Sequence, residues 1–433
     1  MNVDFIGLLK KEIVPAQGCT EPIAVAYAVS LAVEKLGMKE SICSIDLFLS
    51  GNIIKNALGV GIPGTGRVGI EIAAALGAII AEPEKKLEIL EGFDHKQLKL
   101  AESLLPKIKI KQKNTKEKLY IEALVTGASH EVRVILAQSH TNVIYMEKDG
   151  IILYDRKDDK ADINESDRTG LTVNNIYEFV ETVPFEKISF LLDCVEMNSK
   201  VSQEGLQGKY GLTVGSQVDS KEKDQPWIQN ATLQILSATC AASDARMDGC
   251  PLPIMTTAGS GNQGIACTIP VIEMARIMKA DDEKLARALA LSNLMVIHIK
   301  EFMGRLSPLC GAAIAGGTGA CCAITYLQGG QLNQIHCAIR NMIASLSGMI
   351  CDGAKKTCAL KIATGTNAAL LSATLALNNI SATSQDGIIF DDVEDTVHNM
   401  EKLVKEGLKQ TDQTILSIML HKKEGGIQHE TSC

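Results

Sequence analysis

The feature that most restricts the fold lies in the second half of the chain, which is rich in Ala, Gly, Ser and Cys. From Trp227 almost to the end, the hydrophobic spacing predicts consecutive helices. Small side chains allow helices to approach one another closely, and they leave room for a buried group that is not a side chain. The uncharged stretch Leu306–Ile339 contains Pro308, His336 and many glycines, so it predicts a packed core segment rather than a membrane span.

The first half of the chain mixes helix and strand patterns. Val3–Val14 and Pro22–Leu36 have the spacing of amphipathic helices, and Gly37 closes the second of them. Proline in the first turn and glycine after the last turn are usual helix start and stop signals. Cys43–Leu49 alternates apolar and polar positions as a strand does, and Val68–Ala81 predicts a nearly apolar helix.

From Leu119 to Tyr154 the hydrophobic period changes to two, which is typical of strands. Lys148-Asp149-Gly150 between two short apolar runs predicts a hairpin. We therefore predict an α+β fold with an N-terminal α/β part, a small antiparallel sheet and a mostly helical C-terminal half. The three parts would comprise residues 1–110, 111–200 and 225–433. The polar segments expected to be linkers or loops are Arg156–Arg168 and Ser199–Gln225.

The charge balance limits the partners of the chain. Its 43 Lys and Arg against 51 Asp and Glu leave a formal net charge of −8, and aromatic residues make up 4%. Nucleic acid or an anionic membrane would need a basic face, and base stacking would need aromatic platforms, so neither partner is expected. Residues 1–14 carry charges and lack the apolar core of a signal peptide, so we expect a cytoplasmic protein.

Cysteine is the most informative residue type. The chain has 13 cysteines, an odd number, and no export signal, which argues against structural disulfides. No C-x-x-C pair occurs, which argues against zinc fingers and thioredoxin motifs. Buried core cysteines, metal ligands and catalytic thiols remain as interpretations.

A polar motif, Gly18-Cys19-Thr20-Glu21-Pro22, directly precedes the second predicted helix. Backbone N–H groups at a helix start attract anions and lower the pKa of a cysteine placed there. The motif therefore predicts a carboxylate site with a reactive thiol. A polar helix cap with a buried cysteine is the alternative.

Three further loops have the composition of ligand-binding segments. Ser50–Asn56 and Ile62–Arg67 could bind a small polar ligand through amides and Asn side chains, although ordinary turns look the same. Asp244–Gly249 leads into Ala258–Gly264, which resembles the S-x-G-N-x-G loop of pyridoxal-phosphate dehydratases. A glycine-rich loop that binds a carboxylate needs the same residues. No Schiff-base lysine stands out, because the candidates all lie in the polar segment: Lys200, Lys209, Lys221 and Lys223.

The strongest chemical signal is the set Cys310, Cys351 and Cys358. Three thiolates that meet at one site would hold a soft metal centre, and Lys355 or Lys356 could offset its negative charge. Three buried core cysteines at these spacings are the alternative.

Taken together and in this order, the segments resemble the iron–sulfur L-cysteine desulfidases, which are related to the α part of iron–sulfur L-serine dehydratases. The similarity covers nearly the whole chain. The motif GCTEP favours the desulfidases, because the serine dehydratases have a motif like S-H-T-x-G-P in its place. The short C-x₆-C spacing of Cys351 and Cys358 also favours the desulfidases. The resemblance implies a serine dehydratase α-like fold and a [4Fe–4S] cluster held by Cys310, Cys351 and Cys358, with one iron open to substrate.

The implied reaction cleaves L-cysteine with water to pyruvate, sulfide and ammonia. An open iron would bind the substrate thiolate and stabilise charge on the departing sulfur. A base near Cα is also required, for which Cys19 is the first candidate and Lys55 the second. The residues expected to bind the substrate carboxylate are Thr20, Ser50, Asn52, Thr65, Ser260 and Asn262. The terminal Cys433 could occupy the open iron in a resting state, or it is an incidental residue of an exposed tail.

Four other interpretations stay open at this point. They are L-serine dehydration on the same cluster, a pyridoxal-dependent lyase, a zinc hydrolase with three cysteine ligands, and a non-catalytic amino-acid-binding protein. The expected partner is a small amino-acid substrate, and a homodimer is compatible with the sequence.

Overall fold

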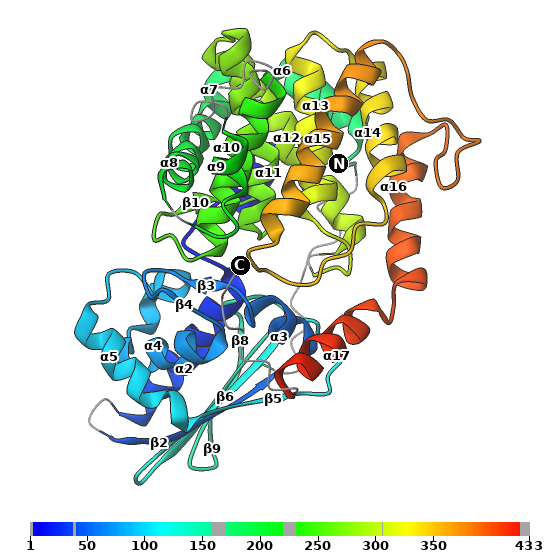
Figure 1. Ribbon diagram of the computed structural model, residues 1–433. Coiled ribbons are helices and arrows are strands. Elements are labelled where there is room, and N and C mark those ends of the chain that lie inside the picture. The colour runs from blue at the N-terminus through cyan, green and yellow to red at the C-terminus, as the bar shows by residue number, and fades with distance from the viewer. Residues whose placement is uncertain are drawn as a thin grey trace.

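The computed structural model describes residues 3–37, 40–156, 170–208, 210–219, 231–304 and 306–424. The described chain forms two parts that lie one above the other, a part built on a sheet and a helical part (Figure 1). The observed fold is α+β with a helical C-terminal half, as the sequence predicted.

The first part contains a six-stranded sheet with the order β5-β2-β6-β7-β8-β9. Strand β2 is parallel to β5, and the other neighbours are antiparallel. The strands are β2 (Ile42–Leu49), β5 (Ile108–Gln112), β6 (Tyr120–Gly127), β7 (Glu131–Ala137), β8 (Val143–Lys148) and β9 (Ile151–Asp155). Because side chains alternate along a strand, Ile45, Leu47 and Leu49 of β2 all point into the core and are fully buried.

Two apolar helices, α2 (Thr20–Leu36) and α4 (Ile70–Ile80), share one core with this sheet. Their backbones touch at Gly77, where a Cβ atom would lie 2.2 Å from the carbonyl oxygen of Ala26. The shorter elements of this part are α3 (Gly51–Ala57), β3 (Gly61–Ile62), β4 (Arg67–Val68), η1 (Pro83–Glu88), α5 (His95–Leu104) and η2 (Leu105–Lys107).

The helical part surrounds a second, larger core. Its long helices are α10 (Ala231–Met247), α11 (Gly261–Met278), α12 (Asp282–Met303), α13 (Gly317–Leu327), α14 (Leu332–Leu346) and α15 (Cys358–Leu377). Around them lie α6 (Val173–Thr182), α7 (Phe185–Ile188), η4 (Ser189–Leu192), α8 (Asp193–Gln207), α9 (Val214–Val218), η5 (Ala312–Gly316), α16 (Val393–Lys402) and η6 (Leu403–Gly407). Small residues permit the expected close packing, since a Cβ at Gly319 would lie 2.5 Å from the carbonyl oxygen of Ser292.

One helix among the described residues, α15, is long and apolar enough to cross a membrane by length and composition alone. Within its apolar window, 44% is buried, and the helix packs against α10, α13 and α14. These contacts are those of a helix that belongs to the protein core.

Both ends of the described chain cross between the two parts. Helix α1 (Phe5–Glu12) packs on α12, and β1 (Pro15–Ala16) pairs antiparallel with β10 (Ile254–Met255) of the helical part. At the other end, α17 (Thr411–Glu424) returns to the sheet part and packs on α3 (Figure 1). The two parts are therefore joined by segments from both ends of the sequence.

The predicted borders differ from this arrangement. Residue 110 lies inside β5, and β2 pairs with β6, so the first two predicted ranges share one sheet. Residues 171–194 contribute to the helical core instead. The loop prediction for Ser199–Gln225 is wrong for its first residues, because α8 continues to Gln207. Residues 157–168 and 220–225 lie outside the described ranges.

Candidate active site

A cavity of about 460 Å³ lies where the two parts meet. The sheet part contributes the Cys19–Glu21 motif, Asn56, residues 116–119 and residues 138–140. The helical part contributes Arg246, residues 258–260, 262 and 263, then residues 300, 304, 306, 307, 309–312, 351, 353, 354 and 358, three of which are cysteines. Because residues from both parts line it, the cavity exists only in the assembled fold.

The three cysteines predicted as metal ligands line this one cavity. Cys310 and Cys351 lie on adjacent extended segments that are joined by an antiparallel bridge between Leu309 and Ile350. The N–H of Cys310 donates to the carbonyl oxygen of Met349 at 2.8 Å, and the N–H of Cys351 donates to that of Pro308 at 2.6 Å. Cys358 is the first residue of α15. The fold thus brings together thiols that lie far apart in the sequence.

Burial keeps two of these thiols protonated. It raises the pKa of Cys310 to about 11, with a further contribution from Cys351, while the backbone N–H groups of Ala313 and Ala312 oppose the shift. Burial likewise raises the pKa of Cys358 to about 12, against the opposing charge of Lys361. Metal binding requires the thiolates and would therefore release protons at this site.

The donor set fits an iron–sulfur cluster by its chemistry. Thiolates are the usual ligands of such clusters, and three of them face one cavity. In the described ranges, no group of three or more His, Cys, Asp and Glu side chains is arranged to hold a metal ion. A cluster attaches each thiolate to a different iron, so its ligands need not converge as closely as those of a single ion.

The lysine beside the thiols is not one of the two that were predicted. Lys355 pairs with Asp352 at 3.4 Å, and Lys356 pairs with Asp248 at 2.7 Å. Lys361, one turn into α15, contacts Asp352 and donates to the carbonyl oxygen of Ile350 at 3.0 Å. Its positive charge acts on both Cys310 and Cys351.

Cys19 caps the start of α2 and is 3% exposed. Burial raises its pKa to about 12, and the nearby guanidinium of Arg246 opposes this shift. The prediction that the helix start lowers the pKa of Cys19 is therefore wrong in this fold, because desolvation outweighs the favourable charges. The thiol still lies on the cavity wall.

Arg246 connects the N-terminal motif to the first turn of α11. Its Nη2 donates to the carbonyl oxygen of Gly18 at 3.0 Å and to Cys19 Sγ at 3.4 Å, and its Nη1 donates to Asn262 Oδ1 at 3.2 Å. Its Nε is buried without a hydrogen-bond partner among the described residues and faces Gly261, where a Cβ would lie 2.3 Å away. Within the same ranges Arg246 forms no ion pair with a carboxylate, so its positive charge remains available to an anion in the cavity.

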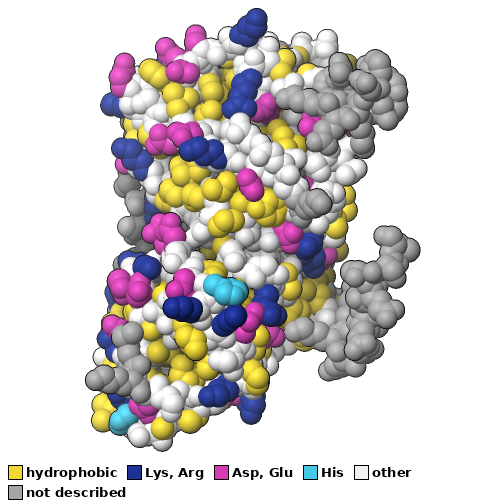
Figure 2. Space-filling model, turned by 60° about the vertical axis from the view of Figure 1, so that its left-hand side comes forward, with side chains coloured by type: hydrophobic (Ala, Val, Ile, Leu, Met, Phe, Trp, Pro, Cys, Tyr) yellow, Lys and Arg dark blue, Asp and Glu magenta, His cyan; other side chains and the backbone are white. Residues whose placement is uncertain are grey.

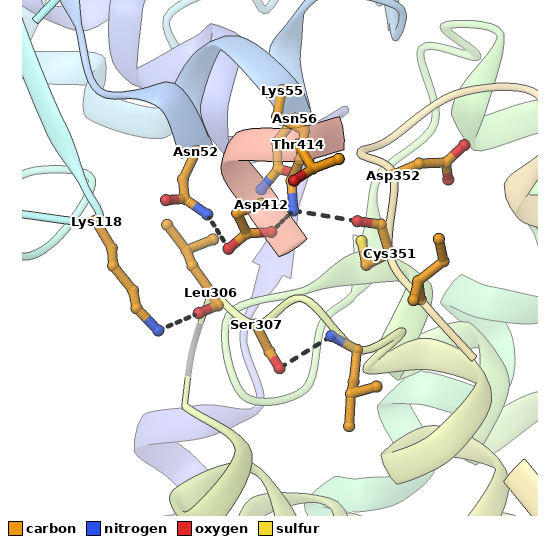
Figure 3. A network of polar contacts seen from close by, with 12 residues as sticks. Asn52, Lys55, Asn56, Lys118, Leu306, Ser307, Cys351, Asp352, Asp412 and Thr414 are labelled. Carbon is orange, nitrogen blue, oxygen red and sulfur yellow. Dashed lines mark hydrogen bonds and ion pairs between the residues drawn. The ribbon is translucent and has the colours of Figure 1, made fainter. Parts of the chain in front are cut away.

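Four of the predicted catalytic and substrate-binding residues line the cavity, namely Cys19, Thr20, Ser260 and Asn262. The other four do not, and their polar atoms bond to the protein. The Ser50 hydroxyl donates to the Lys118 carbonyl oxygen at 2.8 Å, and that of Thr65 donates to Ile62 at 2.7 Å. Asn52 and Lys55 both bond to Asp412 (Figure 3). Cys433 lies outside the described residues.

The sequence did not single out several side chains of the cavity. They include Glu21, Asn56, His140, Arg246, Gln263 and Lys300. Four of them, Glu21, Asn56, Arg246 and Gln263, belong to segments that the sequence marked as ligand-binding candidates, but no role was assigned to these side chains. Lys300 is 6% exposed near the end of α12, where its helical surroundings give no local signal of a cavity.

Comparisons with known proteins give one matching family model and several similar proteins. The family model for the serine dehydratase alpha chain matches residues 84–417. A UPF0597 protein of Clostridium perfringens (strain ATCC 13124) is 55% identical over 422 residues, which cover 97% of this chain and 98% of the relative. A UPF0597 protein of Parabacteroides distasonis is 44% identical over 427 residues (98% and 99%). One of Aeromonas hydrophila is 42% identical over 426 residues (98% and 97%).

Proposed function

The chain belongs to the serine dehydratase alpha chain family, and on that premise we propose that it is an iron–sulfur L-cysteine desulfidase. The family makes it a dehydratase-like lyase. The proposed reaction cleaves L-cysteine with water to pyruvate, sulfide and ammonia. We propose that it acts in the cytoplasm on the free amino acid, with neither nucleic acid nor a membrane as partner.

The observation that carries the proposal is the shared cavity of four cysteines. Cys310, Cys351 and Cys358 line it from the helical part, and Cys19 lines it from the N-terminal motif. The three ligands would hold a [4Fe–4S] cluster, which when bound supplies a Lewis acid with one iron open to the substrate sulfur. The fourth cysteine is then free for a role in the reaction.

The side chains around Cys19 account for the binding of an amino-acid carboxylate. Arg246 has no carboxylate partner within the described ranges, and a guanidinium is well suited to a carboxylate. Thr20, Ser260 and Asn262 add hydroxyl and amide donors on the same wall. These groups would orient the substrate with its Cα towards the N-terminal motif.

We assign Cys19 as the base that removes the Cα proton. Its thiolate is stabilised by the hydrogen bond from Arg246, whereas burial opposes ionisation. General-base catalysis needs the thiolate, so the proposal requires that the Arg246 guanidinium and substrate binding populate the ionised form of Cys19. Lys55, the second candidate, does not line the cavity and is bonded to Asp412 instead.

The test is anaerobic purification followed by iron and acid-labile sulfide analysis, with two activity assays. We expect about four irons per chain and sulfide release from L-cysteine in excess of pyruvate release from L-serine. Cys310→Ala, Cys351→Ala and Cys358→Ala should each lose iron. Cys337→Ala is the matched control, because Cys337 is buried in the helical core and does not line the cavity.

The family name favours one competing activity, L-serine dehydration on the same cluster. A soft iron–sulfur site prefers a thiolate to the harder hydroxyl of serine. Faster turnover of L-serine than of L-cysteine would replace the desulfidase proposal by this alternative. A colourless, iron-free protein would contradict both.

A further inference from the structure

A buried lysine connects the C-terminal helix with the segment that carries Cys351. The side chain of Lys55 is 2% exposed, and its Nζ lies 2.6 Å from Asp412 Oδ1 and 3.2 Å from the carbonyl oxygen of Cys351 (Figure 3). Asn52 donates to the other carboxylate oxygen of Asp412 at 2.9 Å. Asp412 belongs to the first turn of α17, and Lys55 to α3. Three distant elements of the chain therefore meet at one ammonium group.

The backbone of Cys351 is held on both sides. Its N–H donates to the carbonyl oxygen of Pro308, and its own carbonyl oxygen accepts from Lys55. The segment around it, residues 350–354, is called here the Cys351 loop. Gly353 in this loop has φ of +94°, and a Cβ there would lie 2.0 Å from the carbonyl oxygen of Lys55. The loop thus rests directly on the last turn of α3.

The other two cysteines are held by the helical part. Cys310 bonds through its N–H to Met349 and precedes the buried turn η5. Cys358 is part of α15 and bonds through its N–H to Lys355. Among the contacts of the described residues, Cys351 is the one of these three cysteines whose backbone accepts a hydrogen bond from a charged side chain of the sheet part.

We infer that Lys55 and Asp412 are positioning residues for Cys351. The carboxylate of Asp412 fixes the ammonium of Lys55, and this ammonium fixes the carbonyl, and with it the thiol, of Cys351. The inference rests on the proposed function in treating Cys351 as a cluster ligand. It gives Lys55 a role that differs from the base expected from the sequence. Because α17 supplies Asp412, the C-terminal helix is part of the cluster-binding apparatus.

Three variants test this inference. Lys55→Met removes the donor and keeps the length of the side chain, and Asp412→Asn removes the charge that holds the donor. The double variant Lys55→Met with Asp412→Asn removes both charges, so no buried charge is left without a partner to destabilise the fold. Lys113→Met is the control, because its ammonium pairs with Glu122 at 2.8 Å and Glu122 keeps a second partner, Arg133.

The first measurement uses the iron-free protein and mass spectrometry of iodoacetamide labelling at single cysteines. We expect Cys351 to react about tenfold faster in all three variants than in the wild type, because a lost hydrogen bond eases local opening. The labelling rate of Cys310 should stay unchanged, and the control should match the wild type. The second measurement is iron per chain after reconstitution, which should fall in the three variants.

The two measurements separate this inference from the proposed function. If the wild-type protein takes up no iron, the proposed function fails, while selective labelling of Cys351 still supports the positioning role. If Cys351 in the double variant reacts at the wild-type rate, the inference is overturned. It is also overturned if all the cysteines react faster together, because the variants would then have loosened the whole fold.

Discussion

Arg246→Lys is the most direct perturbation of the junction between the N-terminal motif and the helical part. Lysine keeps the positive charge, but its compact ammonium cannot span the acceptors on Gly18, Cys19 and Asn262 that the planar guanidinium reaches. A hydrogen bond from a charged donor contributes about 1.5–3 kcal/mol. If lysine keeps one oxygen acceptor and loses the other, the free energy of unfolding should fall by about 1.5–3 kcal/mol.

The same change should reduce catalysis more than stability alone explains. Cys19 and Asn262 would no longer be held by one rigid group, and a misplacement of about 1 Å at a reacting centre can cost about 100-fold in rate. We therefore expect kcat/KM for L-cysteine to fall by about two orders of magnitude, with iron content retained. Urea unfolding, iron analysis and sulfide release under anaerobic conditions measure the three quantities.

Arg276→Lys is the matched control for this experiment. Arg276 pairs with Glu273 and donates to Ser199 Oγ at 3.0 Å, and its side chain is 47% exposed outside the cavity. Partly exposed pairs contribute about 0–1 kcal/mol, so this variant should lose little stability and no activity. The reasoning on Arg246 is refuted if the two variants lose the same stability and the same activity.

Three further changes test other parts of the structure. Cys19→Ala should keep its iron and lose sulfide release, and full activity would remove Cys19 from the reaction. Gly353→Ala should lower the iron content, and left-handed strain alone should lower the free energy of unfolding by about 1–2 kcal/mol, because φ of Gly353 is +94°. The added Cβ would also clash with the Lys55 carbonyl oxygen in α3. The control Gly348→Ala has open space around it and should change neither quantity. Burial raises the pKa of Glu394, but a hydrogen bond with His298 and one from the Val173 N–H outweigh this and leave the pKa lowered. The stabilisation is present above the ordinary value of 4.5 and is lost as the pH falls through the lowered pKa. Glu394→Gln should therefore weaken urea resistance at pH 7 and match the wild type at a pH well below 4.5.

Local hydrophobic periodicity was sufficient to predict the helices and strands that bury one face. The alternation of Cys43–Leu49 predicted β2, because Ile45, Leu47 and Leu49 are the residues that point into the core. The small residues of the second half predicted close helix packing, which Gly319 confirms by its contact with α12. Hydrophobic periodicity does not show which strands pair with each other. The sequence therefore contains no local signal for the parallel pairing of β2 with β5, and for this reason the predicted border at residue 110 falls inside β5.

The chemistry of the site was easier to predict than its electrostatics. Spacing left core packing open as an alternative, and the family resemblance selected these three of the 13 cysteines, which the structure places around one cavity. A helix start lowers the pKa of an exposed cysteine, but the burial of Cys19 depends on tertiary packing that no local rule contains. The same limit explains Lys55, whose carboxylate partner lies 357 positions away. Without that partner in view, an isolated lysine in a polar loop is a reasonable candidate for a base.

The position of the cavity between the two parts couples assembly of the fold to assembly of the site. Cys351 receives one hydrogen bond from the sheet part through Lys55, and Cys19 receives one from the helical part through Arg246. Each part therefore orients a thiol that is carried by the other. Separation of the parts would remove the Lys55 hydrogen bond from the Cys351 carbonyl oxygen and the Arg246 hydrogen bond from the Cys19 thiol. The cavity with its four cysteines therefore forms only where the two parts are docked, and α17 contributes to that junction through the ion pair of Asp412 with Lys55.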